Sequence, residues 1–135
     1  MLTNNSYSET THSIKVSVKP TYLERESYPY REHYTWAYSV TLENEGDETV
    51  QLISRHWRIT DGNGVLKEIK GSGVVGEQPV LKPSSSFSYT SGTLLSTPTG
   101  IMQGSYDMVN DSGKKFSIKI PAFSLDSSEQ LAKPN

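Results

Sequence analysis

The clearest strand pattern in the chain is YTWAYSVTL, residues 34–42. Its large apolar and aromatic side chains occupy every second position, from Tyr34 through Trp36 to Leu42, and small or hydroxyl-bearing residues fill the positions between them. Because successive side chains of a strand point to opposite faces of a sheet, this pattern puts all the large side chains on one buried face. The segment is therefore predicted to be a central core strand, with Trp36 as its buried tryptophan.

Further strands are predicted on both sides of this segment, at 14–18, 50–60, 65–69, 87–95, 100–108 and 116–125, most of them from apolar residues at alternate positions. Turn residues separate several of them, at 44–47, 61–64 and 111–113. Between Leu52 and Ile53 the apolar positions change parity, which predicts a β-bulge or a strand covered on both sides. About seven short strands without helical periodicity predict an all-β, immunoglobulin-like or fibronectin type III-like β-sandwich of two antiparallel sheets, with Tyr106 as a candidate tyrosine corner.

Length and composition indicate a single domain. The chain has 135 residues and a mass of 15.0 kDa. Residues 1–11 and 126–135 lack an apolar pattern and are predicted to be flexible tails around a domain of residues 12–125. The absence of cysteine excludes disulfides, thiolate metal sites and cysteine nucleophiles. With no secretion signal or membrane-spanning run, and a net charge of -2, we expect a cytoplasmic protein without nucleic-acid or membrane partners.

The glycine-rich segment KGSGVVGEQP, residues 70–79, has two interpretations. Gly71, Gly73 and Gly76 match the spacing G-x-G-x-x-G, whose glycines let a backbone approach a pyrophosphate at the start of a helix. The alternative is a sharp loop between strands, built from the residue that tolerates a positive φ angle.

The residues around this segment favour the structural loop. Pro79 and Pro83 argue against a helix, and no acidic residue lies between Glu77 and Asp107 to bind a ribose. A nest of backbone amides could still hold an anion without a helix. The basic side chains that could assist it are Arg58, Lys67 and Lys70.

The densest cluster of charged and aromatic residues is RHWR, residues 55–58. Arginine and tryptophan are favoured interface anchors, and a histidine among them can donate or accept a hydrogen bond. We expect Trp57 to lie in the core. Arg55, His56 and Arg58 are candidates for a partner surface.

No catalytic or metal site is predicted. The three histidines, His12, His33 and His56, are far apart in the sequence. Residues 61–65 begin like a calcium-binding loop but lack its later acidic ligands, so they are predicted to be a turn. No serine lies in a nucleophile elbow. We therefore expect neither an enzyme nor a resident metal or cofactor.

Several motifs together resemble the bacterial ApaG family. They are RHWRITDGNG at 55–64, GSGVVGEQP at 71–79, FSYTSG at 87–92, GIMQGSYDM at 100–108 and IPAF at 120–123. The resemblance covers about residues 12–125 and implies a fibronectin type III-like sandwich. The serine run at 84–86 departs from it, because the family tends to carry a glycine after Pro83.

The resemblance implies binding rather than catalysis. Similar domains occur in eukaryotic F-box proteins and in a DNA polymerase delta-interacting protein, where they look like interaction modules. The bacterial family is associated with cobalt and magnesium homeostasis, and its glycine pattern, here Gly71, Gly73 and Gly76, has been interpreted as a pyrophosphate site. We therefore expect a non-catalytic module that binds another protein. The alternatives are nucleotide or polyphosphate binding at the glycine-rich segment, and binding of divalent cations near His56 or Asp61.

Overall fold

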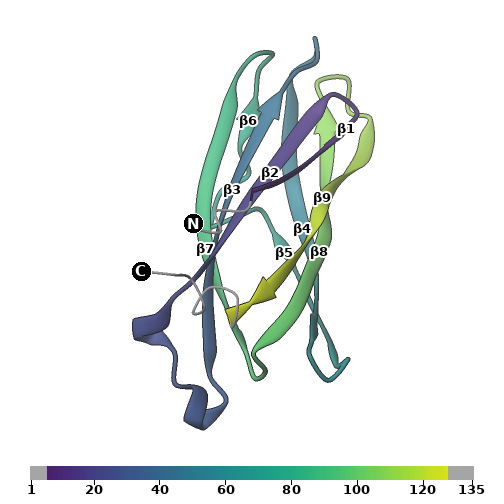
Figure 1. The fold of residues 1–135 in the computed structure, drawn as a ribbon. Coiled ribbons are helices and arrows are strands. Elements are labelled where there is room, and N and C mark those ends of the chain that lie inside the picture. Colours follow the sequence, from purple (N-terminus) through teal and green to yellow (C-terminus); the bar gives the residue numbers. More distant parts are fainter. Residues whose placement is uncertain (1–5, 128–135) are drawn as a thin grey trace.

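The computed structural model describes residues 6–127 as a β-sandwich of two antiparallel sheets (Figure 1), which confirms the predicted fold class. One sheet has the strand order β1-β2-β3-β7, and the other has the order β5-β4-β8-β9, with β6 also pairing with β4. The described elements are β1 (Tyr7–Thr11), β2 (Ile14–Tyr22), η1 (Glu24–Glu26), η2 (Pro29–Arg31), β3 (Tyr34–Asn44), β4 (Val50–Asp61), β5 (Leu66–Ser72), β6 (Val80–Leu81), β7 (Ser86–Leu95), β8 (Thr99–Asn110) and β9 (Lys115–Asp126). Within residues 6–127, no helix is both long and apolar enough to cross a membrane.

The core lies between the two sheets and is centred on aromatic side chains. Trp36 of β3 is 1% exposed, as its place in the alternating pattern predicts. Trp57 of β4 faces it from the other sheet, with its ring 5.1 Å from the ring of Tyr38 and 6.1 Å from that of Phe123. Both tryptophans are therefore core residues, as the sequence predicts, and the clusters around them tie the sheets together.

The predicted change of face in the fourth strand is confirmed. The pairing of β4 with β8 shifts register between Leu52 and Ser54, so Leu52 and Trp57 can both face the core although their positions differ in parity. One extra residue in a strand reverses the facing of everything beyond it. The bulge therefore determines which side chains of residues 54–61 point inward.

The prediction of a flexible tail at residues 1–11 is wrong for residues 7–11. These residues form β1, an edge strand that pairs with β2 from Tyr7 opposite Val18 to Thr11 opposite Ile14. The ring of Tyr7 packs 5.8 Å from that of Phe123. An edge strand needs few apolar side chains because its backbone is held by the neighbouring strand, which is why the pattern is so weak.

The C-terminal boundary and the tyrosine corner also differ from prediction. β9 continues through Pro121 to Asp126, and Ser127 is buried, with its hydroxyl donating to the carbonyl of Pro98 at 2.9 Å. The domain therefore extends past residue 125, and the remainder of the expected tail, residues 128–135, lies outside the described residues. Tyr106 bonds to the hydroxyl of Tyr89, whereas a tyrosine corner bonds to the backbone.

Candidate functional site

A groove of about 460 Å³ opens at the end of the sandwich where η2, the β4–β5 turn and the end of β7 meet. Its floor includes the buried side chains of Ile59 and Leu95. Val65 and Leu94 also line it and are 61% and 49% exposed. We call this feature the end groove; its other lining residues are Arg31, Glu32, His33, Asp61, Lys67 and Ser96.

One wall of the end groove is a small, ordered hairpin. Tyr28 and His33 exchange backbone hydrogen bonds of 2.8 and 3.1 Å, and the turn between them closes with Glu32 at a φ of 57°. The hairpin presents Tyr30, which is 79% exposed, with the guanidinium carbon of Arg31 5.7 Å from the centre of its ring. Tyrosine and arginine dominate the energetics of many protein interfaces, so this wall has the composition of an interaction surface.

The opposite wall is the β4–β5 turn. The carboxylate of Asp61 accepts hydrogen bonds from the amides of Asn63 and Val65 at 2.9 and 3.0 Å, as an Asx turn requires. This confirms that residues 61–65 form a turn. One oxygen of the only carboxylate in that segment is therefore already occupied by hydrogen bonds within the turn. The turn also holds Val65 out toward solvent at the groove, and the next residue, Leu66, is 52% exposed.

The glycine-rich segment is a turn that backbone hydrogen bonds hold together and against β4. The amide of Gly73 donates to the carbonyl of Ile53 at 2.8 Å, and Val74 and Glu77 exchange amide-to-carbonyl bonds of 2.8 and 2.9 Å. Gly73 has a φ of 60°, and a Cβ there would lie 2.2 Å from the carbonyl oxygen of Glu77. The turn inserts Val74 into the core. Three amides of the segment thus point to carbonyls, which favours the structural interpretation.

Arg55 braces this segment from the core side. Its position shares the parity of Trp57, so it faces inward, and its Nη1 donates to the carbonyls of Ser72 and Gly73 at 3.0 and 2.9 Å. Gly71 lies directly opposite on β5, where a Cβ would come within 2.8 to 2.9 Å of the guanidinium. Gly71 therefore makes room for the guanidinium, and Gly73 permits the turn that follows.

The structure does not bring Arg55, His56 and Arg58 onto one surface. His56 and Arg58 have the opposite parity to Arg55 and lie on the outer face of the sheet. Nε2 of His56 is 2.7 Å from the carboxylate of Glu68 on β5. The hydrogen bond from His56 is the largest cause that lowers the pKa of Glu68 below its usual value. The alternation of the strand, visible in the sequence, is what separates the three residues.

A buried pair of tyrosines lies between the sheets. The hydroxyls of Tyr89 on β7 and Tyr106 on β8 are 2.5 Å apart. Burial raises the pKa of both hydroxyls well above the usual value, and the charge of Arg55 opposes this only in part. The pair therefore stays protonated at neutral pH and is a structural contact between the sheets.

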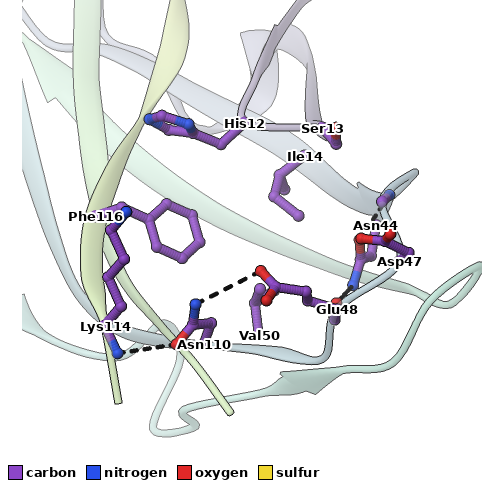
Figure 2. A pocket seen from close by; sticks show the side chains of 11 residues that line it. His12, Ser13, Ile14, Asn44, Asp47, Glu48, Val50, Asn110, Lys114 and Phe116 are labelled. Carbon is purple, nitrogen blue, oxygen red and sulfur yellow. Dashed lines mark hydrogen bonds between the residues drawn. The ribbon is translucent and has the colours of Figure 1, made fainter. Parts of the chain in front are cut away.

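A second cavity, of about 260 Å³, lies at the other end of the sandwich, between the β1–β2, β3–β4 and β8–β9 turns. Figure 2 shows Phe116 and Lys114 together on one side of it, His12 above them, and Asn110 at the base between Lys114 and Glu48. The side-chain amide of Asn110 is 3.5 Å from the carboxylate of Glu48. Residues 6–127 contain no group of three or more His, Cys, Asp or Glu side chains arranged to hold a metal ion.

Comparison with known proteins identifies the family. The model of the ApaG domain matches residues 24–110. The chain belongs to the ApaG family. It is 57% identical over 129 residues to Protein ApaG of Rhodospirillum centenum, with 96% of this chain and 99% of the relative covered. Protein ApaG of Paramagnetospirillum magneticum is 54% identical, with the same coverage.

A solved structure supports both the family and the fold. The ApaA protein from Bordetella pertussis superposes on this ApaG-family chain with a TM-score of 0.83 and 44% sequence identity, covering 87% of this chain and 95% of that one. Each of these relatives is covered over nearly its whole length. The sandwich of residues 6–127 contains the whole stretch that the ApaG domain model matches.

The end groove of this ApaG domain is not predicted from the sequence. Residues 22–30 show no period, so they are interpreted only as a connection. The available signal is YPYR at 28–31, in which two tyrosines flank a proline and an arginine follows. Aromatic residues beside a proline in a polar connection indicate an ordered loop that displays its rings.

Proposed function

We propose that this ApaG-family protein is a non-catalytic module that binds another protein at the end groove and acts in the cytoplasm. The observation that carries the proposal is the exposure of Val65 and Leu94 in a groove of about 460 Å³, beside a hairpin that exposes Tyr30. Large apolar side chains that gather around a concave site indicate an interaction surface. Isolated exposed apolar residues, in contrast, need no explanation.

The rigidity of the groove walls supports the same function. The Tyr28–His33 hairpin and the turn at Asp61 are each held by several hydrogen bonds, so little order has to be created when a partner binds. Binding sites formed by ordered loops on a β-sandwich are a common use of this architecture. Arg31 and Lys67 at the rim supply polar contacts around the apolar centre.

The proposal is tested by site-specific photo-cross-linking in a native lysate. The photoreactive residue p-benzoylphenylalanine replaces Leu94 in the groove or, as a control, Lys119 on the exposed face of β9. We expect a discrete protein adduct from position 94, none from position 119, and loss of the adduct in the Val65→Asp variant. Identical adducts at both positions, no adduct at either, or an adduct that survives Val65→Asp would overturn the proposal.

A further inference from the structure

Strand β7 differs from every other edge strand within residues 6–127. Edge strands are usually protected from pairing with other chains by charges, proline, bulges or short length. β1 has five residues and contains Glu9, β5 carries Lys67, Glu68 and Lys70, and β9 contains Pro121 and pairs through a shifted register. β7 has ten residues and none of these features.

The absence of charge extends well beyond β7. From residue 83 to residue 106 the sequence contains no Asp, Glu, Lys, Arg or His. β7 pairs with β3 in continuous register from Tyr34 opposite Leu95 to Glu43 opposite Ser86. Its other edge has no strand beside it among the described residues. Alternate backbone amides and carbonyls of an antiparallel edge strand face outward, so β7 offers a long, uncharged row of hydrogen-bonding groups.

Hydroxyl contacts hold β7 firmly in this position. On the outer face of the sheet, Thr90 is 3.0 Å from Ser39 and Ser88 is 2.9 Å from Thr41, measured between side-chain oxygens. Tyr89 anchors the inner face through its bond to Tyr106. The edge is therefore preorganised for pairing with a further strand.

The end groove is continuous with this edge. Leu94, Leu95 and Ser96, at the end of β7, all line the groove. A strand that paired with β7 would therefore run directly into the groove at one end. The edge supplies backbone hydrogen bonds, and the groove supplies a pocket that discriminates between side chains. In β-strand addition the first gives affinity and the second gives specificity.

Building on the proposed function, we infer that the partner presents an extended, uncharged segment that adds to β7 as a further antiparallel strand. The segment lacks proline and carries small, hydroxyl-bearing or β-branched residues opposite Ser88 and Thr90. Because it runs antiparallel, its N-terminal end lies beside Leu95. A large apolar side chain at that end enters the groove next to Val65 and Leu94.

The size of the edge favours an extended segment over a second copy of this chain. Ten residues make an edge of about 33 Å, and with a sheet thickness of about 10 Å a rigid partner covers about 330 Å² on each side. The total of about 660 Å² is roughly half of what a stable interface between folded proteins needs. A flexible segment overcomes this limit because it can also fill the groove.

The test uses random 12-residue peptides displayed on phage and selected against the whole protein. The selected peptides are synthesised and titrated into ¹⁵N-labelled protein. We expect amide shifts along Ser86–Leu95, and slower hydrogen exchange of the outward-facing amides. Thr90→Lys should weaken peptide binding about tenfold or more, because lysine at an edge opposes strand pairing.

Ser39→Lys is the matched control. Ser39 lies opposite Thr90 on β3, so the substitution breaks the same hydroxyl contact and adds the same charge one strand away from the edge. We expect it to leave peptide binding within about twofold of the original value. Equal weakening by both variants would contradict strand addition.

Other outcomes would also overturn the inference. These are selected peptides that leave the β7 amides unshifted, a selection that yields no binding peptide, and concentration-dependent dimers of the protein that Thr90→Lys dissociates. The two proposals can fail separately: if cross-linking at Leu94 captures a partner and Thr90→Lys does not reduce the capture, the proposed function stands and only strand addition to β7 is refuted.

Discussion

The contact between Arg55 and Gly71 predicts that the effect of Gly71→Ala on stability depends on whether Arg55 is present. A methyl group at position 71 would lie 2.8 to 2.9 Å from the guanidinium of Arg55. The guanidinium would have to move, and it would lose its hydrogen bonds to the carbonyls of Ser72 and Gly73. Gly71→Ala should therefore remove the interactions that Arg55→Ala removes.

The magnitudes follow from these two charge-assisted hydrogen bonds. Arg55 is only half-buried, so we expect Arg55→Ala to lower the free energy of unfolding by about 2 kcal/mol, toward the low end for bonds to a charged group. Gly71 does not have a positive φ, so alanine fits its backbone conformation. By lowering the conformational entropy of the unfolded chain, alanine there should stabilise the fold by about 0.4–1 kcal/mol. Gly71→Ala should thus cost about 1 kcal/mol in the original protein and be neutral or stabilising in Arg55→Ala.

The assay is urea unfolding of the two single variants and the double variant at pH 7 and 25 °C. Arg58→Ala is the control for arginine removal, because Arg58 lies on the outer face and should change stability by less than about 0.5 kcal/mol. If Gly71→Ala has the same effect in both backgrounds, Arg55 does not brace the glycine-rich segment.

Three further predictions concern other residues of the sandwich. Val75→Asn should stabilise the fold by about 1 kcal/mol in urea unfolding, because Val75 is 55% exposed and has a φ of 43°, which asparagine tolerates better; destabilisation would contradict this. Tyr106→Phe should cost about 1–3 kcal/mol, by leaving the buried hydroxyl of Tyr89 without its partner, and the double phenylalanine variant should cost less than the two single changes together. Glu68→Gln tests linkage: the pKa of Glu68 is lowered from 4.5, so its stabilisation is present above pH 4.5 and is lost as the pH falls below it. The difference in urea midpoint between Glu68→Gln and the original protein should therefore shrink from pH 7 to pH 3.

The sequence was sufficient for most of the strands and for the bulge. Strict alternation in residues 34–42 predicts β3 and the burial of Trp36, and the parity change near Leu52 predicts the shift in β4. Both are local signals that survive because the two faces of a strand meet different environments. β1 escaped prediction because its stability comes from the backbone of β2, which leaves little trace in its own side chains.

The candidate site was less predictable, because it depends on which distant segments meet. The sequence groups Arg55 with Arg58, although alternation places them on opposite faces and Arg55 reaches the carbonyls of Ser72 and Gly73. The end groove joins residues near 31, 65 and 94, and no local pattern relates these positions. Such a site depends on how the strands are ordered in the sheets, which local sequence patterns do not reveal.

The glycine-rich segment is a structural turn, and the proposed recognition occurs elsewhere on the sandwich. Titration of ¹⁵N-labelled protein with diadenosine tetraphosphate distinguishes this turn from a ligand site. We predict that the amides of Gly71, Gly73 and Gly76 do not shift at millimolar ligand. Saturable shifts confined to these three amides would contradict the claim and establish the segment as a polyphosphate site.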